Sequence, residues 1–370
     1  MTTLSSPTLL NAAYFVAGGV AVSATNYIIS ALNKPMPVAD QKIRELFQRL
    51  HINEWHLPGL SSNLPYINPN IKPPQPIFNM KIQSEIDVIK QRIEKAKERD
   101  GEYPLPNLVI TGRPGVGKSM VARDIIFKSG AGFICVPPGI LDNHIKTGTH
   151  ITTLYELIDV SKLCDKKVAL IFDDSEGAFS RRPILNKPEA KDTTKAEWIT
   201  DIKHLSNTID ERRSAWLSAV LEETGKDNRN VSAIATTNLI ENFDPAFLTR
   251  AHVLVIDAPG EEERKNIIIQ HLPLIFENRT DILSFFDKRI LSNIAKKTEG
   301  FTGRNLLKML EDLYACIQID NWDIREETID AAIIAIKRSI DEHNMAKNTQ
   351  PASFESRIHG ISKKFQNIFS

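Results

Sequence analysis

The sequence has few of the groups that mark redox or metal chemistry. Its cysteines (Cys135, Cys164 and Cys316) form no Cys-x-x-Cys pair, and its nine histidines form no His-Glu-x-x-His motif. We therefore predict neither a disulfide framework nor a zinc site, and expect small buried thiols in a reducing compartment. A charge excess is also lacking, with 46 basic and 46 acidic residues. No overall field attracts the chain to nucleic acid, so no nucleic-acid partner is expected.

Charge is absent from the beginning of the chain, where the first charged side chain is Lys34. The apolar run from Leu9 to Leu32 is long enough to span a hydrocarbon core as a helix, which predicts a hydrophobic helix and single-pass membrane anchor at residues 1–33. Basic residues follow the run and would keep the rest of the chain on the cytosol-like side of a bacterial or mitochondrial inner membrane. A buried or peripheral helix is the alternative. A cleaved signal peptide is disfavoured because no basic segment precedes the run.

What the chain does contain is a complete phosphate-binding sequence, Gly-x-x-x-x-Gly-Lys-Ser, at residues 112–119. It follows a short apolar run and precedes a helical pattern, the context in which backbone N–H groups can surround a triphosphate. We predict that Lys118 reaches the β- and γ-phosphates of ATP and that Ser119 places its hydroxyl on Mg²⁺. The predicted ATP-binding residues are Gly112, Pro114, Gly115, Val116, Gly117, Lys118, Ser119 and Met120.

Short apolar runs alternate with helical patterns on both sides of this loop. They predict an α/β fold with a five-stranded parallel sheet flanked by helices. The expected strands are Leu108–Thr111, Phe133–Val136, Val168–Phe172, Val231–Thr236 and Val253–Ile256. Beyond Pro259 the pattern is wholly helical, which predicts an all-α lid domain. The predicted parts are a hydrophobic helix at 1–33, a proline-rich connector at 34–75, a nucleotide-binding domain at 76–259, a helical lid at 260–345 and an amphipathic tail at 346–370.

Polar side chains follow two of the expected strands. Asp173 and Asp174 end one strand, and Asn238 ends the next. A carboxylate at the carboxyl edge of a parallel sheet can hold the water shell of Mg²⁺, and a second can polarise the attacking water. We therefore predict a metal-binding role for Asp173, a catalytic role for Asp174 and a water-orienting role for Asn238. Simple capping or turn formation is the alternative for each.

Six motifs occur along the chain in the order GRPGVGKS, ALIFDD, ATTN, FDPAFLTR, DAPGEEER and TEGFTGR. In this order and spacing, residues 76–345 resemble the AAA+ ATPases. They look most like the membrane-anchored group named ATPase-family AAA-domain-containing protein three, while the pachytene-checkpoint remodellers are a weaker match.

The resemblance implies Mg-ATP hydrolysis by a ring-forming homo-oligomer, expected to be a hexamer, that remodels a protein partner. It also implies catalytic roles for three residues. Asn238 would be the sensor-one residue, Arg250 an arginine finger for the neighbouring subunit, and Arg304 the sensor-two residue of the lid.

Two positions depart from the family pattern. Asp174 stands where glutamate is usual, and an arm shorter by one methylene misplaces the carboxylate enough to cost on the order of a hundredfold in rate. Glu176 is a candidate substitute whose direction the sequence does not reveal. The segment Gly139–Asn143, where relatives place a pore loop, has no aromatic residue. The chain is therefore predicted to be a slow ATP hydrolase or, alternatively, an ATP-binding scaffold or switch with little hydrolysis. A replication-type loader is a third hypothesis, disfavoured by the neutral charge.

Three further features leave alternatives open. Arg181 and Arg182 are either contacts to a neighbouring subunit or solvated side chains. In the long segment 183–210, one helical face carries Trp198, Ile199, Ile202 and Leu205. That face predicts internal packing or, as the minority hypothesis, a second axial loop or partner site. The apolar spacing after Pro351 predicts docking on the lid or contact with a membrane or partner.

Overall fold

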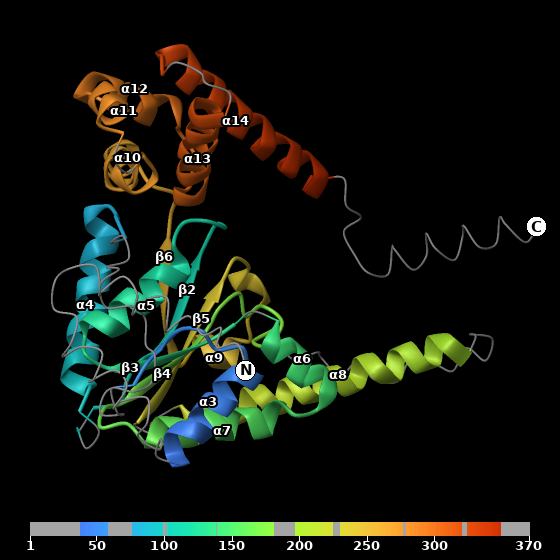
Figure 1. The fold of residues 1–370 in the computed structure, drawn as a ribbon. Helices are drawn as coiled ribbons and strands as arrows, with labels where there is room; N and C mark the ends of the chain where they lie inside the picture. The colour runs from blue at the N-terminus through green and yellow to red at the C-terminus, as the bar shows by residue number, and fades with distance from the viewer. Residues whose placement is uncertain are drawn as a thin grey trace, which may run out of the picture. The chain divides into compact units, whose positions relative to one another are not determined.

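The protein forms two compact units, described here from a computed structural model. The structure describes residues 38–57, 76–98, 101, 103–137, 139–180, 197–224, 230–276, 279–319 and 324–348. The first unit ends at Asp257 and the second begins at Ala258 (Figure 1). The hydrophobic helix predicted at 1–33 and the tail beyond residue 348 lie outside these ranges. Within them, no helix combines the length and apolar character needed to cross a membrane.

A mixed sheet with strand order β1-β3-β4-β5-β2-β6 forms the centre of the first unit. Strands β3, β4, β5, β2 and β6 are parallel, which agrees with the predicted runs. The prediction of a purely parallel five-stranded sheet is wrong at one edge, where β1 pairs antiparallel with β3. A strand of two residues is too short to leave a periodic signal. The bounds are β1 Trp55–His56, β2 Asn107–Gly112, β3 Gly132–Val136, β4 Val168–Phe172, β5 Val231–Thr237 and β6 Ala251–Ile256.

Both faces of the sheet are covered by helices. In β2, Leu108 and Ile110 pack into one hydrophobic cluster, while Val109 packs into the other. Because the central strands are buried on both sides, they read in the sequence as continuous apolar runs. Helices α4 (Met80–Ala96) and α5 (Lys118–Lys128) supply the first cluster, and α3 (Val38–Arg49), α6 (Ile140–Thr147), α7 (His150–Lys162), α8 (Glu197–Glu223) and α9 (Pro245–Leu248) supply the second.

Local signals explain where α4 begins and which side it buries. Its isoleucines recur at helical spacing, and Ile86 and Ile93 are almost completely buried against the sheet. The side chain of Asn79 accepts a hydrogen bond of 3.0 Å from the backbone N–H of Ile82, which caps the first turn. The helix predicted from this periodicity is therefore present.

The described half of the region predicted as a connector, residues 38–57, is packed on the first unit. Ile43 and Leu50 of the α3 segment are 1% and 0% exposed. The rings of Phe47 and Trp55 lie 5.4 Å apart, which joins α3 to β1. Burial of this kind is typical of a domain element and not of an extended linker. Residues 58–75, which hold most of the prolines, lie outside the described ranges.

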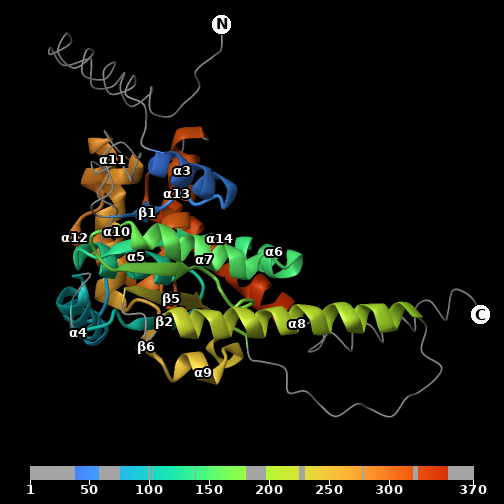
Figure 2. The same cartoon turned by 90° about the horizontal axis from the view of Figure 1, so that it is seen from below.

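Helix α8 is the longest element of the first unit, at 27 residues. Figures 1 and 2 both show its first half projecting away from the other elements of that unit, while its second half lies beside them. Trp216 in the second half is completely buried and packs edge-on against Phe172 of β4. The side chains of the predicted face at Trp198, Ile199, Ile202 and Leu205 lie outside the described part, as do Arg181 and Arg182.

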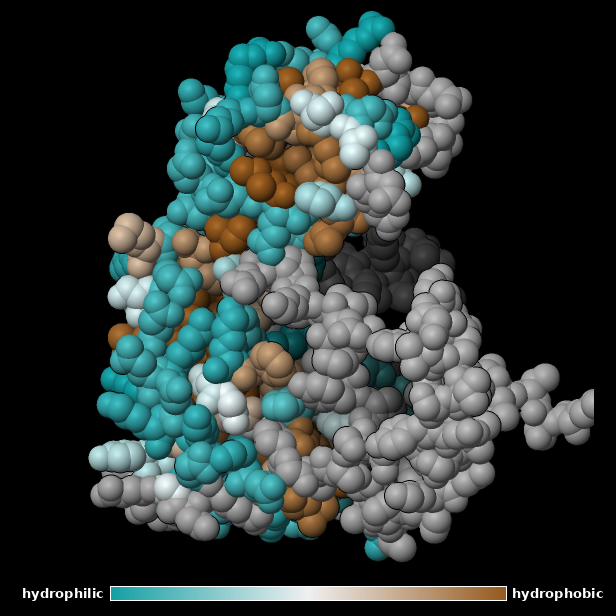
Figure 3. Space-filling view, turned by 60° about the vertical axis from the view of Figure 1, so that its left-hand side comes forward, coloured by the Kyte–Doolittle hydropathy of each residue, from teal (hydrophilic) through white to brown (hydrophobic). Residues whose placement is uncertain are grey.

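The second unit is helical, as predicted. Its helices are α10 Glu261–Phe276, α11 Thr280–Phe285, α12 Lys288–Lys297, α13 Gly303–Ile319 and α14 Glu326–Asn348. Phe276, Ile294, Leu306, Leu310 and Ile333 are among the side chains of its core. Figure 3 shows further hydrophobic side chains at the surface of this unit. Leu274 and Ile334 are two hydrophobic residues of the unit that are exposed to solvent.

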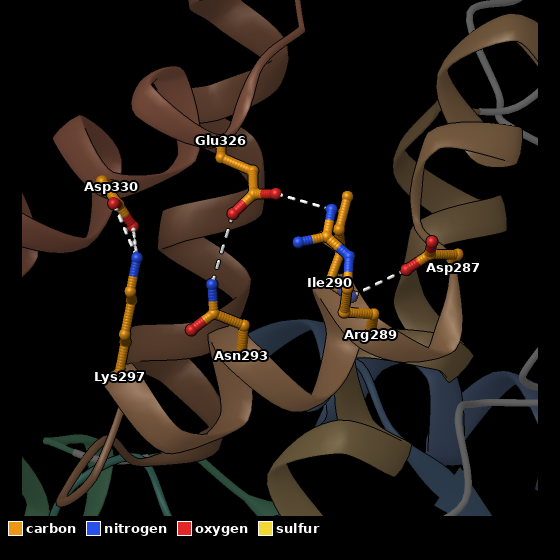
Figure 4. A network of polar contacts seen from close by, with 7 residues as sticks. All are labelled: Asp287, Arg289, Ile290, Asn293, Lys297, Glu326 and Asp330. Atoms are coloured by element: carbon orange, nitrogen blue, oxygen red, sulfur yellow. Dashed lines mark hydrogen bonds and ion pairs between the residues drawn. The ribbon is translucent and has the colours of Figure 1, made fainter.

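Surface ion pairs join α12 to α14 within the second unit (Figure 4). Arg289 donates to Glu326 over 2.7 Å, and Lys297 donates to both carboxylate oxygens of Asp330 over 2.6 Å. Asp287 caps α12 by accepting from the N–H of Ile290 over 2.8 Å. These contacts fix the two helices to each other at the solvent side.

Candidate nucleotide-binding site

The phosphate-binding sequence forms the turn between β2 and α5. Strand β2 ends at Gly112, and α5 begins at Lys118. Gly117 has a φ of 95° at the cap of α5, a conformation that favours glycine. At Gly112 an added Cβ would lie 2.1 Å from the carbonyl oxygen of Ile256, so only glycine fits between the loop and β6. The sequence therefore builds a tight turn whose backbone N–H groups lead into a helix N-terminus, an arrangement suited to phosphate.

Lys118 lies inside this turn and is 6% exposed. Its Nζ donates to the carbonyl oxygens of Gly112 and Arg113 over 3.1 and 3.2 Å. The same Nζ donates to Oδ1 of Asn238 over 2.5 Å. The ammonium group is thus fixed at the mouth of the loop by three oxygens, and its charge lies where a phosphate would bind.

Ser119, Asp173 and Thr236 form a second group of oxygens beside the loop. Oδ1 of Asp173 accepts from Oγ of Ser119 over 2.5 Å and from Oγ1 of Thr236 over 2.6 Å. Three elements, α5, the end of β4 and β5, supply these atoms. Hydroxyl and carboxylate oxygens are the ligands that Mg²⁺ prefers, commonly with one carboxylate and the phosphates of a nucleotide. The hydroxyl of Ser119 and the carboxylate of Asp173 are therefore suitable ligands for Mg²⁺.

The turn after β4 directs Asp174 toward the next strand end. Its φ is 41°, in the left-handed region that aspartate tolerates better than most residues. Its backbone N–H donates to Oγ1 of Thr236 over 3.0 Å. Nδ2 of Asn238 donates to Oδ1 of Asp174 over 3.5 Å. The amide of Asn238 therefore lies between Lys118 and Asp174, and the structure brings these three side chains together.

Glu176 points toward the end of β5, a direction that the sequence left open. Its Oε1 accepts from the N–H of Asn238 over 2.6 Å and from Oγ1 of Thr237 over 3.0 Å. The carboxylate is therefore engaged in holding the backbone that carries Asn238. Sequence reasoning did not assign this role, and it also overlooked Thr236, whose polar side chain at the end of an apolar strand was the available signal.

The other predicted residues lie outside this group of contacts. Arg250 is exposed after α9 and makes no side-chain hydrogen bond or ion pair within the described ranges. Arg304 is exposed at the start of α13 and belongs to the second unit. Met120 follows Ser119 in α5. At the start of α6, where a pore loop was considered, Leu141 is 7% exposed and packs in the core, so it does not present its side chain to solvent.

A cavity of about 290 Å³ adjoins Ser119 and Asp173. Its lining includes Glu54 from the segment before β1, Arg123 from α5 and Cys135 from β3. Burial raises the pKa of the Cys135 thiol far above its usual range, so the sulfur stays protonated. The side chains next to the expected metal ligands are thus an ion pair and a neutral thiol.

Comparisons with known proteins agree with this geometry. Residues 108–257 match the family described as ATPase family associated with various cellular activities (AAA). The chain is 25% identical over 211 residues to human ATPase family AAA domain-containing protein 3A, covering 55% of this chain and 32% of that protein. It is 25% identical over 241 residues to the Drosophila melanogaster homolog of that protein, covering 63% and 36%.

Two further matches have other names. The ATP-dependent zinc metalloprotease FtsH of Leptotrichia buccalis is 25% identical over 269 residues, covering 72% of this chain and 29% of that protein. The solved FIGL-1 AAA domain in complex with ADP aligns with a TM-score of 0.48 and 14% identity, covering 88% of this chain and 96% of that chain. The matched region spans about a third of the length of the AAA domain-containing relatives.

Proposed function

We propose that the chain, whose residues 108–257 match the AAA ATPase family, binds Mg-ATP at the loop 112–119, hydrolyses it slowly and uses the cycle to remodel a protein partner. The observation that carries the proposal is the convergence of Lys118, Ser119, Asp173 and Asn238 from α5, β4 and β5 on one sheet edge. Charged and amide groups gathered at the carboxyl ends of parallel strands are typical of nucleotide sites.

Each residue has a distinct task in this proposal. The N–H groups of the loop and the ammonium of Lys118 bind the phosphates, and Lys118 already lies at the loop mouth. Ser119 and Asp173 would hold Mg²⁺, which neutralises charge on the phosphate oxygens when bound. Asn238 orients the attacking water, and Asp174 accepts its proton from the adjacent position.

A scaffold or switch with little hydrolysis is the second candidate, and one observation favours it. Glu176, the nearest other carboxylate in the strand-end turn, is bonded to Asn238 and Thr237. It is therefore not directed at the water position and does not replace the short arm of Asp174. Misplacement of a reacting group by about an ångström costs on the order of a hundredfold in rate.

Assembly and location are also part of the proposal. The exposed Arg250 would reach the site of a neighbouring copy, since an arginine finger supplied from outside contributes on the order of 10³ to 10⁵ in rate. Arg304 would sense the γ-phosphate, and the homo-oligomer would be a hexameric ring. The apolar run at 9–32 supports a single-pass anchor with the ATPase domain on the cytosol-like side of a bacterial or mitochondrial inner membrane. The neutral charge supports a protein partner over nucleic acid.

The test measures binding and turnover separately on the full chain. Calorimetry with ATP and Mg²⁺ should give a saturable signal that Lys118→Ala removes, and phosphate release should depend on Asp174. Turnover that stays detectable and falls in Asp174→Asn supports the hydrolase, whereas binding without turnover supports the scaffold. Absence of nucleotide binding by the folded wild-type chain would contradict both the hydrolase and the scaffold.

A further inference from the structure

Glu54 and Arg123 line the same cavity as Ser119 and Asp173 but are not among the residues assigned to ATP or Mg²⁺. We infer that they are a positioning pair, which fixes the edge strand β1 to the magnesium end of the site and couples metal-nucleotide binding to the docking of α3 and β1. The inference rests on the proposed function. Glu54 and Arg123 come from distant parts of the sequence. We therefore expect a change at Ser119 to alter the docking of the segment 38–57, and the reverse.

Arg123 is the centre of the connection. It lies one helical turn after Ser119 in α5, and its Nε donates to the carbonyl oxygen of Ser119 over 3.0 Å. Its Nη1 is bonded to the carboxylate of Glu54. A guanidinium group is planar and presents its donors in a fixed fork, so binding Glu54 on one side fixes the direction of the donor on the other. Ser119 in turn donates to Asp173 over 2.5 Å.

Glu54 is itself held by backbone contacts. Its carbonyl oxygen accepts from the N–H of Cys135 over 2.9 Å, and the following residues Trp55 and His56 pair with Ile134 and Phe133 of β3. The core residues of α3 hold Trp55 from the other side. The position of the carboxylate therefore depends on the pairing of β1 with β3 and on its packing against α3.

The solvent exposure of the Glu54–Arg123 pair indicates that it contributes little to the free energy of unfolding, which leaves the positioning of neighbouring groups as its role. The side chains of Arg123 and Glu54 are 33% and 42% exposed. Ion pairs that are this accessible to water contribute little to the free energy of unfolding. The cavity of about 290 Å³ lined by both side chains is also lined by Ser119 and Asp173, so the pair lies beside the expected metal ligands. Residues that orient metal ligands typically change metal affinity by 10- to 100-fold when altered.

The first experiment measures Mg²⁺-dependent binding of a fluorescent ATP analogue to the full chain. Arg123→Gln should raise the Mg²⁺ concentration for half-maximal binding by about tenfold, and Glu54→Gln should produce a smaller rise in the same direction. Arg123→Lys keeps the charge and should recover part of the affinity. Lys128→Gln is the matched control, since Lys128 lies in the same helix, pairs with Asp124 over 2.8 Å and is 39% exposed. Its Mg²⁺ dependence should equal that of the wild type.

A double variant tests whether the two side chains act as a unit. Combining Glu54→Gln with Arg123→Gln should add little to the effect of Arg123→Gln alone, because both changes break one connection. Fully additive effects, or equal Mg²⁺ dependence in the wild type and Arg123→Gln, would overturn the inference.

Amide hydrogen exchange gives a readout independent of turnover. Mg-ADP should slow exchange both in the loop 112–119 and in residues 53–57 of the wild type, and Arg123→Gln should lose only the second effect. If Mg-ADP protects the loop of the wild type but does not change exchange at residues 53–57, the nucleotide site is supported and the coupling between the site and β1 is refuted. Lack of protection in both segments would instead refute the proposed function.

Discussion

Two polar clusters, one in each unit, use the same kinds of side chain in different surroundings. At the strand ends of the first unit, Lys118 is 6% exposed and bonded to three oxygens. On the surface of the second unit, Lys297 is 39% exposed and bonded to Asp330. A buried cation requires fixed partners because water does not replace them, whereas an exposed one is solvated when its partner is removed. The comparison predicts large functional effects in the first cluster and small stability effects in the second.

Replacing Lys118 should produce the largest difference between the clusters. Lys118→Ala removes a cation whose charge-assisted hydrogen bonds to phosphate are worth about 1.5–3 kcal/mol each, so two such bonds correspond to a loss of affinity of about a hundredfold or more. Calorimetric titration with Mg-ATP measures this loss of affinity. Lys128→Ala, in the same helix, is the control and should bind normally. Equal affinities in the two variants would contradict the placement of the phosphates.

Changing the length and charge of Asp174 should sharpen the role of the strand-end cluster. Asp174→Asn should lower the rate of phosphate release by about a hundredfold, and Asp174→Glu should raise it by about tenfold by extending the carboxylate toward the water. Nucleotide affinity should change little in either variant. A slower Asp174→Glu enzyme would show that the turn with φ of 41° already places the aspartate well.

Glu176 separates positioning from binding within the same cluster. Glu176→Ala removes the acceptor for the N–H of Asn238, so the amide that orients the water loses its support. We expect kcat to fall about tenfold with the nucleotide Kd unchanged, while Glu176→Gln, which keeps one acceptor oxygen, should be close to the wild type. A fall in affinity that equals the fall in kcat would instead indicate disruption of the loop.

The pH dependence of stability should come mainly from the first unit. Burial lowers the pKa of His56, His144 and His150 below 6.5. The unfolded chain therefore takes up protons first, so this stabilisation is complete above the unfolded-state pKa of about 6.5 and is lost as the pH falls from there through the lowered pKa values of the folded chain. Thermal unfolding at pH 7.5 and 5.5 should show a lower Tm in acid, and His56→Gln should reduce the difference. An unchanged difference would exclude His56 as a contributor.

The smallest effects are expected in the second unit. Lys297→Met removes the exposed pair with Asp330 and should change the free energy of unfolding by less than about 1 kcal/mol. Denaturant unfolding measures this change, and nucleotide binding should be the same as in the wild type. If Lys297→Met changed the free energy of unfolding by several kcal/mol, as the loss of a buried cation does, the exposed cluster would not differ from the buried one in its energetics.

Much of the first unit was predictable because its signals are local. The apolar runs from Val168 to Phe172 and from Val231 to Thr236 mark strands buried on both faces, and parallel strands bring their carboxyl ends to one edge. Asp173 and Asn238 each follow a strand directly, so the sequence indicated that they lie near Lys118. Their chemical roles stay predictions, as do those of Arg250 and Arg304.

The parts that escaped prediction depend on contacts between distant segments. Trp55 and His56 form a strand only because β3 offers them a partner far along the chain. The bond between Glu54 and Arg123 follows from that pairing and has no local signal. The sequence did not reveal the direction of Glu176, which is decided by the N–H of Asn238 after another strand. Local propensity does not contain such information.

The antiparallel pairing of β1 with β3 has a practical consequence for anyone who trims the chain. A fragment beginning at residue 76, the domain start suggested by the prolines, would lack α3 and β1 and uncover the outer N–H and C=O groups of β3. Bare strand edges recruit other chains, so such a fragment should aggregate. Biochemists should instead keep the residues from Val38 onward.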